Sequence, residues 1–498
     1  MVYNFNLGIG WASSGVEYAQ LYRARMFRAL GEPARFVFTD MFPQENIEHF
    51  TRAIGFEDDE VDWLYTHFTD FRIAPVTYTL AQFQDTIGDQ DFVVTRDGKV
   101  GRLQFAGQGD YCTLYFTDER HDLLHRVEYV SGGRLIRKDY FTYGRIYSEY
   151  YAPLDGRAHL YLRRFFNEDG SVAYEEMPSA NGSTFRFADQ VLFSKEDLVG
   201  HLVRSLNLSA SDTVIIDRTT GIGQAILQNV GDARVGVVVH ADHYSVSGTD
   251  DRHVLWNNYY EYPFDMYRHI DFFVTSTQAQ ADLMAEQFRR YVGEAPRIVV
   301  IPVGSLDHLT RPSKPRRPFS VVTASRLASE KHLDWVIEAI VLARGRVPGL
   351  TLDICGEGSE LGRLQALVRE RGAGQYVRLL GQMDMAQVYP NYELYLSGST
   401  SEGFGLSLME AVGSGLAMIG FDVPYGNPTF IDDGENGYLV PVREAMTEGE
   451  RVRALADCVV RYFLHDDHAA FERRSYQIAE DYLTERVAER WNGVIGTR

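Results

Sequence analysis

Residues 319–331, with the sequence FSVVTASRLASEK, join a short apolar stretch to a polar turn and the expected start of a helix. The stretch Phe319–Ala324 has the β-branched, apolar composition of a buried strand. Arg326 follows in the turn, and Glu330 and Lys331 are expected to open the next helix. Cations beside the positive end of a helix suit a diphosphate. Taken alone, the same residues also fit an exposed Arg and Lys at the start of an ordinary helix.

A second motif, EGFGLSLME at residues 402–410, places carboxylates at both ends of a glycine-rich turn and a helix start. Gly403 and Gly405 let backbone N–H groups come close to a ligand, because glycine carries no side chain. Glu402 and Glu410 can accept hydrogen bonds from sugar and ribose hydroxyls. The alternative is a pair of surface glutamates that flank a helix cap. Since both motifs lie in one region, their combination favours a binding site for phosphate and sugar.

The region around these motifs alternates apolar strands with segments compatible with helices. It begins after residues 311–318, RPSKPRRP, whose prolines and basic residues predict a stiff, exposed hinge. The expected strands are Phe319–Ala324, Thr351–Cys355, Tyr376–Leu380, Leu394–Ser397 and Ala417–Phe421. The end of the chain is expected to form amphipathic helix. This alternation predicts a parallel sheet that is covered by helices on both faces.

A similar alternating region runs from residue 1 to about 75 and resumes near 195. It opens with a strand at Val2–Leu7, a glycine-rich turn at Gly8–Gly15 and a helix from Val16. Further expected strands are Ala34–Thr39, Thr213–Asp217, Arg234–Val239, Phe272–Thr275 and Ile298–Ile301. Two α/β lobes joined by a hinge predict a cleft at the carboxyl ends of the strands, where folds of this kind bind ligands.

The stretch between the two parts of this first region is rich in Tyr, Phe, Val and Arg. Turn signals at Asp97-Gly98, Gly132-Gly133 and Asp169-Gly170 predict hairpins, and hence an antiparallel β-meander inserted into the first lobe. The predicted domains are residues 1–75 with 195–311, the insertion 76–194, a C-terminal domain 312–480 and a terminal helix 481–498 that returns to the N-terminal lobe.

Composition narrows the class of protein. The 498 residues carry a net charge of −20, which argues against nucleic acid as a partner, because phosphate contacts need a basic face. No apolar run is long enough to span a membrane, and the N-terminus lacks the features of a signal peptide. Cys112, Cys355 and Cys458 are widely spaced, which fits a reducing compartment. A cytoplasmic enzyme is expected.

The two C-terminal motifs, with Cys355-Gly356-Glu357-Gly358 between them, resemble those of glycosyltransferase family 4, retaining enzymes of the GT-B fold. The resemblance implies two Rossmann-like domains that face a cleft. It also implies that Arg326 and Lys331 neutralise the diphosphate of a UDP-sugar. In the same way, Glu402 is expected to face the donor sugar and Glu410 to hold the ribose.

The glycine-rich turn near the N-terminus indicates a resemblance to a smaller group of enzymes within this family. Residues 8–20, GIGWASSGVEYAQ, and the meander insertion resemble the catalytic subunits of the accessory-Sec glycosyltransferase pair of Gram-positive bacteria. His240, which follows the strand Arg234–Val239, is then expected to contact the donor sugar, with His243 as the second choice. The other donor-binding residues implied by the two resemblances are Gly15, Val16, Glu17, Tyr18, Gln382, Met383, Gly403, Phe404, Gly405, Leu406 and Glu410. Among these, backbone groups at Gln382 and Met383 are expected to contact the uracil.

The resemblance also implies the reaction and its partners. It implies transfer of N-acetylglucosamine, or of glucose, from a UDP-sugar to Ser or Thr of a serine-rich repeat adhesin, as the first step of O-glycosylation. The expected partner is a paralogous, non-catalytic subunit, joined through the meander in a hetero-oligomer. Any association with the inner face of the cell membrane is expected to run through that partner, because an acidic enzyme does not bind acidic lipid readily.

No metal or other cofactor is expected for the transfer. Asp89-Gln90-Asp91 has the spacing of a metal-binding motif, but it lies in the predicted insertion, away from the expected cleft. Cationic side chains and backbone donors can stabilise the leaving diphosphate instead.

Two alternatives to this function stay open at this point. One is a related enzyme that glucosylates wall teichoic acid, although a polyanionic acceptor should prefer a basic cleft. The other is a non-catalytic, sugar-binding chaperone subunit. That alternative predicts loss of the diphosphate cations or of the paired glutamates, and both are intact in this sequence.

Overall fold

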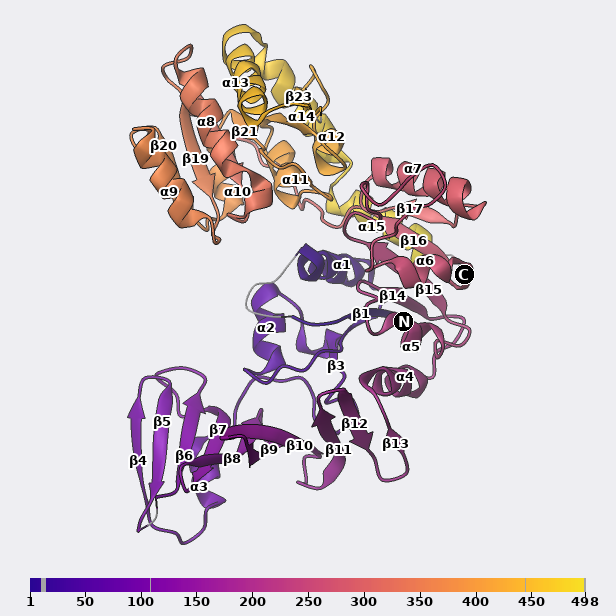
Figure 1. The fold of residues 1–498 in the computed structure, drawn as a ribbon, viewed down its shortest axis with the longest axis vertical. Coiled ribbons are helices and arrows are strands. Elements are labelled where there is room, and N and C mark those ends of the chain that lie inside the picture. The colour runs from indigo at the N-terminus through magenta and orange to yellow at the C-terminus, as the bar shows by residue number, and fades with distance from the viewer. Residues whose placement is uncertain (10–14, 108, 444, 497–498) are drawn as a thin grey trace. The chain divides into compact units, whose positions relative to one another are not determined.

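The computed structural model describes residues 1–9, 15–107, 109–443 and 445–496. The chain divides into two compact units. The first unit contains Met1–Ala24, Gly31–Val238 and Asn258–Asp271, and the second contains Arg25–Leu30, Val239–Asn257 and Phe272–Arg498. Both units hold parallel strands alternating with helices, and the first also holds a large antiparallel sheet (Figure 1). The predicted α/β fold with an antiparallel insertion is therefore confirmed.

The parallel strands of the first unit are arranged around β1 (Val2–Asn6). This strand pairs with β2 (Ala34–Phe38) on one side and with β14 (Thr213–Ile216) on the other. Outside these, β3 (Val61–Trp63) pairs with β2, and β15 (Arg234–Val239) pairs with β14. All residues of β14 are buried, which explains why its sequence is apolar on both faces. β3 was not predicted, because its three residues stand next to acidic neighbours and carry too short an apolar pattern.

Helices connect these strands, as expected for parallel pairing. They are α1 (Gly15–Leu30), α2 (Ile47–Ile54), α4 (Lys195–Ser205), α5 (Gly223–Leu227) and α6 (Glu261–Asp265).

The antiparallel sheet has ten strands in the order β13-β12-β11-β10-β9-β8-β7-β6-β5-β4. Its strands are β4 (Phe92–Asp97), β5 (Val100–Phe105), β6 (Tyr111–Phe116), β7 (Leu124–Ser131), β8 (Arg134–Phe141), β9 (Arg145–Leu154), β10 (Arg157–Phe166), β11 (Val172–Ser179), β12 (Gly182–Arg186) and β13 (Val191–Leu192). The predicted hairpins are confirmed at Gly98, Gly132 and Gly170, whose positive φ angles of 57°, 55° and 82° suit glycine. The order follows the chain throughout, so the predicted meander is confirmed.

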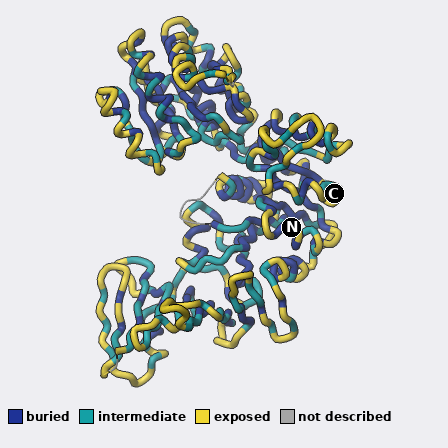
Figure 2. Tube along the Cα trace, viewed as in Figure 1, coloured by how far each residue is buried: buried dark blue, intermediate teal, exposed yellow. Residues whose placement is uncertain are grey.

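One short helix, α3 (Leu80–Asp85), packs on the part of this sheet nearest β4. Its Phe83 joins a buried cluster with Leu103, Leu114 and Val127, which come from three different strands. The free ends of the hairpins are more exposed than this cluster (Figure 2). The insertion therefore has a hydrophobic core of its own.

The C-terminal part of the chain forms a six-stranded sheet in the order β20-β19-β18-β21-β22-β23. Its strands are β18 (Ser320–Ala324), β19 (Thr351–Cys355), β20 (Val377–Gly381), β21 (Leu394–Leu396), β22 (Ala417–Asp422) and β23 (Gly437–Pro441). The helices around it are α8 (Leu333–Arg344), α9 (Leu361–Glu370), α10 (Met385–Val388), α11 (Leu406–Gly413), α12 (Gly426–Phe430), α13 (Glu448–His465) and α14 (His468–Glu480). Val321 and Val322 belong to separate buried clusters, as expected where both faces of a sheet are covered. Figure 2 shows these strands as a buried layer.

The second unit also contains β16 (Phe272–Thr275), β17 (Ile298–Val300), α7 (Gln278–Gln287) and the last helix, α15 (Thr484–Ile495). Leu306 forms an isolated bridge with Leu483, and Thr484 bonds the Ser305 hydroxyl at 3.0 Å. These contacts tie the segment before residue 311 to the end of the chain, and both belong to the second unit. The predicted domain boundaries, including the one at residue 311, stay a prediction.

Candidate active site

The turn after β18 packs directly against the turn after β19. The Ser325 amide donates to the Cys355 carbonyl at 3.1 Å, and the Leu327 amide donates to the Glu357 carbonyl at 2.8 Å. At Gly356, which has a φ of 133°, a Cβ atom would lie 1.9 Å from the Ser325 carbonyl oxygen. Only glycine allows this approach. The glycine motif that the sequence analysis placed between the two chemical motifs therefore shapes the turn that carries Arg326.

Lys331 and Glu402 meet in the fold although they lie far apart in the sequence. Lys331 Nζ lies 2.6 Å from Glu402 Oε2, and their side chains are 16% and 18% exposed. The Ser399 hydroxyl also approaches Glu402 Oε2, at 3.4 Å. The two C-terminal motifs therefore form one cluster, in which Lys331 and Glu402 make a largely buried ion pair.

The prediction that Glu330 and Lys331 open the helix after β18 is wrong. Glu330 and Lys331 lie in a 3₁₀ turn, Ser329–Lys331, and α8 begins only at Leu333. His332 separates the two elements, because its φ of 41° is left-handed and interrupts the helix. Lys331 therefore extends from a tight turn before the helix rather than from the first turn of α8.

Arg326 is held more loosely than Lys331. Its side chain is 73% exposed and its Nη2 lies 2.8 Å from Glu330 Oε1. An exposed pair of this kind costs little free energy to break, so the guanidinium can turn to another anion.

The glycine-rich motif leads into α11 through Gly405. This residue caps the helix with a φ of 85°, a left-handed conformation that suits glycine. Phe404 is buried in one of the cores of the C-terminal sheet, while Leu406 is partly buried against the same core. The Glu402 carbonyl accepts from the amides of Tyr425 and Gly426, both at 2.7 Å. The backbone on either side of Gly403 is therefore fixed by its neighbours.

Glu410 points inward from the second turn of α11. Burial, with a smaller effect of Asp384, raises the pKa of its carboxyl to about 7. Gln382 and Met383 lie between β20 and α10, and both are exposed. Because both side chains are exposed, the expected contact with the uracil through their backbone groups stays a prediction.

The loop after β15 carries the two predicted histidines, and they differ. The His240 carbonyl oxygen lies 3.2 Å from the place that a Cβ atom of Gly403 would take, so this loop contacts the glutamate motif. His243 is fully buried, with Nε2 at 2.8 Å from Gln287 Oε1 and Nδ1 at 3.4 Å from the Tyr425 hydroxyl. Burial lowers the pKa of His243 to about 4. His243 therefore serves in packing, while His240 lies beside the motif.

Two residues of this neighbourhood were missed. Ser401 directly precedes Glu402, and its hydroxyl approaches Asp242 Oδ2 at 3.4 Å. Asp242 stands two positions after His240, so its place after a buried strand was a signal that could have selected it. Nothing in the sequence paired it with Ser401.

The first turn of α1 carries the predicted donor residues of the first unit. Glu17 is buried and accepts from Asn6 Nδ2 at 3.3 Å and from Arg218 Nη2 at 3.4 Å. Its side chain is thus held within the unit, whereas Tyr18 is 40% exposed. A Cβ atom on Gly15 would meet nothing within 4 Å, and Val16 beside it is partly exposed. The rest of the predicted glycine-rich motif, residues 10–14, lies outside the described residues.

Behind this turn lies a buried polar network. Arg23 makes two bonds with Asp217, at 2.8 and 2.9 Å, and a third with Asn4 at 2.9 Å. Gln20 joins Asp217 to Asn6 through bonds of 2.8 and 3.0 Å. Because Asn6 ends β1 and also reaches Glu17, this network fixes the strand and the helix on either side of the glycine-rich turn.

Within the described residues, no three His, Cys, Asp or Glu side chains are grouped so that they could hold a metal ion. In the same part of the chain, no helix has the length and apolar character needed to cross a membrane.

Two regions of the chain match known protein families. Residues 309–458, which carry both C-terminal motifs, match the family of glycosyl transferases group 1. Residues 93–189, which cover most of the antiparallel sheet, match the GtfA extended beta-sheet domain. The fold of this region is thus that of the group 1 glycosyl transferases.

Relatives that match over nearly the whole chain identify its family within the glycosyltransferases. The chain is 50% identical over 495 residues to the UDP-N-acetylglucosamine–peptide N-acetylglucosaminyltransferase GtfA subunit of Streptococcus gordonii, covering 99% of this chain and 98% of the relative. It therefore belongs to the family of these GtfA subunits.

Solved structures of similar proteins agree. The pneumococcal O-GlcNAc transferase GtfA, crystallised in complex with UDP and GlcNAc, is 47% identical with a TM-score of 0.92, covering 99% of this chain and 98% of that one. A chain in the crystal structure of a GtfA/B complex is 49% identical with a TM-score of 0.96, covering 99% of both chains.

Proposed function

We propose that this protein transfers N-acetylglucosamine from UDP-N-acetylglucosamine to Ser or Thr of a polypeptide. The observation that carries the proposal is the 50% identity, over nearly the whole of both chains, to a UDP-N-acetylglucosamine–peptide N-acetylglucosaminyltransferase subunit. The complex of the pneumococcal relative with UDP and GlcNAc supports the choice of N-acetylglucosamine over glucose. The serine-rich repeat adhesin as acceptor rests on the resemblance described above.

The chemistry proposed for the site begins with the leaving group. Negative charge grows on UDP as the bond to the sugar breaks, and preorganised cations and N–H donors stabilise that charge. Lys331 supplies an ammonium that the fold holds in place through Glu402. Arg326 supplies a guanidinium that can leave Glu330 to meet the diphosphate. The amides around Gly403, Gly405 and Leu406 at the start of α11 add neutral donors.

The remaining site residues are proposed to bind the donor. Glu402 accepts hydrogen bonds from the sugar hydroxyls and His240 contacts the sugar, while Glu410 accepts bonds from the ribose. The uracil lies against the backbone of Gln382 and Met383. Gly15, Val16, Glu17 and Tyr18 are also proposed to bind the donor, and Phe404 packs behind the glutamate motif.

We further propose that the transfer retains the configuration at the anomeric carbon, as in glycosyltransferase family 4, and needs no metal. The charged groups at Lys331 and Arg326 supply what a divalent cation would otherwise provide. The absence of a metal requirement is tested by adding a chelator, because a metal-dependent enzyme would lose its activity.

The protein is proposed to act in the cytoplasm within a hetero-oligomer with a paralogous, non-catalytic subunit. The similarity to a chain in a GtfA/B complex supports this partner. Any contact with the inner face of the cell membrane would run through the partner, since this chain carries a net charge of −20.

One assay tests the proposal against its two alternatives. The full chain, with and without the partner, is incubated with a peptide rich in Ser and Thr and with UDP-N-acetylglucosamine or UDP-glucose in EDTA. A mass increase of one N-acetylhexosamine on the peptide is the expected result. Transfer to a teichoic acid polymer but not to the peptide would favour the first alternative. Sugar binding without release of UDP would favour the chaperone.

A further inference from the structure

Asp242 lies in the loop that follows β15, two positions after His240, and it belongs to the second unit together with the glutamate motif. Its side chain is exposed and accepts a long hydrogen bond from Ser401 Oγ, at 3.4 Å. Ser401 directly precedes Glu402 in the sequence. An accessible carboxylate therefore stands beside the residues that are proposed to bind the donor sugar.

The backbone that carries Asp242 is held by hydrogen bonds on three successive carbonyl groups. Gln280 Nε2 donates to the Ala241 carbonyl at 2.9 Å. Asn257 donates twice, from Nδ2 to the Asp242 carbonyl and from its amide to the His243 carbonyl, both at 2.9 Å. Because this part of the loop is fixed, the carboxylate starts from a defined place beside the motif, as a group that acts on a reacting atom must.

The rest of this loop is held as well. Tyr244 and Trp256 form an antiparallel bridge across it. Further along, Arg290 Nη2 pairs with Asp251 Oδ1 at 2.6 Å and so joins the loop to the segment that follows α7. The charge of Asp251 therefore has a cation beside it, which makes this aspartate a useful comparison for Asp242.

Asp242 has no counter-ion among the described residues. Within that part of the chain, Ser401 is the one side chain that bonds its carboxylate. The protein around Asp242 removes water and raises the pKa of its carboxyl, an effect that the hydrogen bond from Ser401 opposes. Such a carboxylate keeps free lone pairs and is a better proton acceptor than a fully hydrated one.

The charge of Asp242 indicates which reactant it meets. A negative side chain near a diphosphate weakens nucleotide binding, because like charges repel. The hydroxyls of the donor sugar already have proposed partners in Glu402 and His240. The acceptor hydroxyl has no proposed partner, and it must give up a proton when it attacks the sugar. A carboxylate without a counter-ion can take that proton.

We propose that Asp242 is the general base for the acceptor hydroxyl. It accepts the hydrogen bond of the Ser or Thr hydroxyl and takes its proton as the hydroxyl oxygen bonds to the anomeric carbon. The bond between that carbon and UDP breaks in the same reaction, its electron pair stays on the diphosphate, and the proton on Asp242 then leaves to solvent. The inference rests on the proposed function and deepens it, because it names the residue that meets the acceptor.

Transfer rates test the inference first. With the full chain, UDP-N-acetylglucosamine and a Ser/Thr peptide, Asp242→Asn is expected to lower kcat about 100-fold, because an amide of the same size cannot take the proton. Asp242→Glu keeps a carboxylate and is expected to retain about a tenth of the wild-type kcat or more. Wild-type kcat in Asp242→Asn would overturn the inference, and so would an Asp242→Glu variant no faster than Asp242→Asn.

Donor binding separates this role from a contact with the sugar. In calorimetric titrations without peptide, Asp242→Asn is expected to bind UDP-N-acetylglucosamine as tightly as the wild type or more tightly, because a negative charge is removed. Weaker binding would assign Asp242 to the donor and overturn the inference. Asp251→Asn is the matched control, because it removes one negative charge from the same loop at a side chain that is 97% exposed, and it is expected to keep the wild-type kcat.

Rescue by a small carboxylate separates proton transfer from a structural role. Formate is expected to raise the transfer rate of Asp242→Ala about fivefold, because it can enter the place of the missing carboxylate, and to leave Asp242→Asn unchanged. No increase in an Asp242→Ala protein that is folded and binds the donor would overturn the inference.

The failure of this inference can be told from that of the proposed function. If the wild type transfers sugar to the peptide and Asp242→Asn does so equally well, the inference fails and the proposed function stands. If the wild type transfers sugar to no acceptor, the proposed function itself fails.

Discussion

Lys331 Nζ lies 2.6 Å from Glu402 Oε2, although the two residues are 71 positions apart in the sequence. The lysine comes from the turn before α8 and the glutamate from the turn before α11, and the two turns follow the neighbouring strands β18 and β21. Because parallel strands end at the same edge of a sheet, the topology brings the two side chains together. The pair is largely buried, so each charge depends on the other to remain in place.

We expect Lys331→Ala and Glu402→Ala each to lower the transfer rate about 100- to 1,000-fold, the effect usual for loss of a preorganised charge at a reacting centre. The double variant should be little worse than either single one, because the two groups act together. Initial rates with UDP-N-acetylglucosamine and a Ser/Thr peptide measure the effect.

The matched control for this pair is Arg346→Ala. Arg346 is 58% exposed and pairs with Asp457 on the surface at 2.7 Å, so its loss should leave transfer unchanged. Wild-type turnover in both Lys331→Ala and Glu402→Ala would mean that the donor site is assigned wrongly.

The two histidines after β15 should respond differently to substitution. His240→Ala is expected to reduce transfer while the protein stays folded. His243→Ala is expected to lower the free energy of unfolding by about 2–4 kcal/mol, because it opens a cavity and leaves Gln287 without its bond. Chemical denaturation of both variants, run beside the transfer assay, checks this division. Equal loss of stability in the two variants would contradict it.

The stability of the protein in acid should also depend on His243. Its pKa of about 4 lies below the ordinary 6.5, so in acid the unfolded chain takes up a proton before the folded chain does. The stability that neutral His243 contributes is therefore present above pH 6.5 and is lost as the pH falls toward 4. The unfolding midpoint of the wild type should fall more steeply across this window than that of His243→Ala.

The sequence predicted most of the fold because buried parallel strands are continuous apolar runs. Arg234–Val239 and Thr351–Cys355 were predicted with their observed bounds for this reason. β3 and β23 were missed, since the first is only three residues long and the second, Gly437–Pro441, starts with glycine and ends with proline. Periodicity is weakest for short strands at the edge of a sheet, and both strands stand at an edge.

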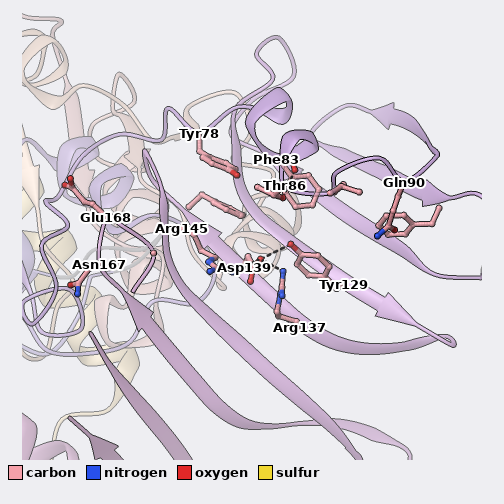
Figure 3. Close-up of a pocket in the computed structure, with 14 residues that line it drawn as sticks. Tyr78, Phe83, Thr86, Gln90, Tyr129, Arg137, Asp139, Arg145, Asn167 and Glu168 are labelled. Atoms are coloured by element: carbon pink, nitrogen blue, oxygen red, sulfur yellow. Dashed lines mark hydrogen bonds and ion pairs between the residues drawn. The ribbon is translucent and has the colours of Figure 1, made fainter. Parts of the chain in front are cut away.

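The motifs predicted which residues form the candidate site, but they did not predict which of these residues contact one another. The pairing of Lys331 with Glu402 depends on the order of β18 and β21, which no local pattern gives. The early end of the turn at Lys331 depends on the left-handed His332, which is rare for that residue type. A pocket beside Asp139 in the antiparallel sheet (Figure 3) was not predicted either, because its residues come from several strands of the meander and from α3, and no local pattern shows that these elements meet.

The buried pair Arg23–Asp217 should be among the costliest to break. The side chains are 2% and 0% exposed, and two hydrogen bonds join them. Asp217→Asn removes a negative charge that two hydrogen bonds hold against the buried guanidinium, so we expect a loss of about 3–5 kcal/mol in the free energy of unfolding. Urea denaturation measures it, with Arg346→Ala as the surface control at less than about 1 kcal/mol. If Asp217→Asn changes stability no more than this control, the network does not hold the first unit together.

Glu410 should make nucleotide binding depend on pH near neutrality. Its carboxyl has a pKa of about 7 in the folded chain because it is buried, against an ordinary value of 4.5. Since only the ionised form is a pure acceptor for ribose hydroxyls, UDP should bind more tightly as the pH rises through 7. Glu410→Gln should bind more weakly at high pH and lack this rise. Because UDP itself also titrates, the test is the difference between wild type and variant in calorimetric titrations from pH 6 to pH 8, which covers about one unit on each side of the carboxyl pKa.

The same carboxyl has the opposite effect on stability. Between pH 4.5 and 7 the unfolded chain loses the proton that folded Glu410 keeps, so the contribution of this group falls as the pH rises and is constant above 7. The total is roughly 3 kcal/mol, which is the shift in pKa converted to free energy. Glu410→Gln cannot titrate, so its unfolding midpoint relative to the wild type should rise across that window. Parallel pH profiles of binding and stability in the two proteins would show that Glu410 does not titrate near neutrality and would place the ribose elsewhere.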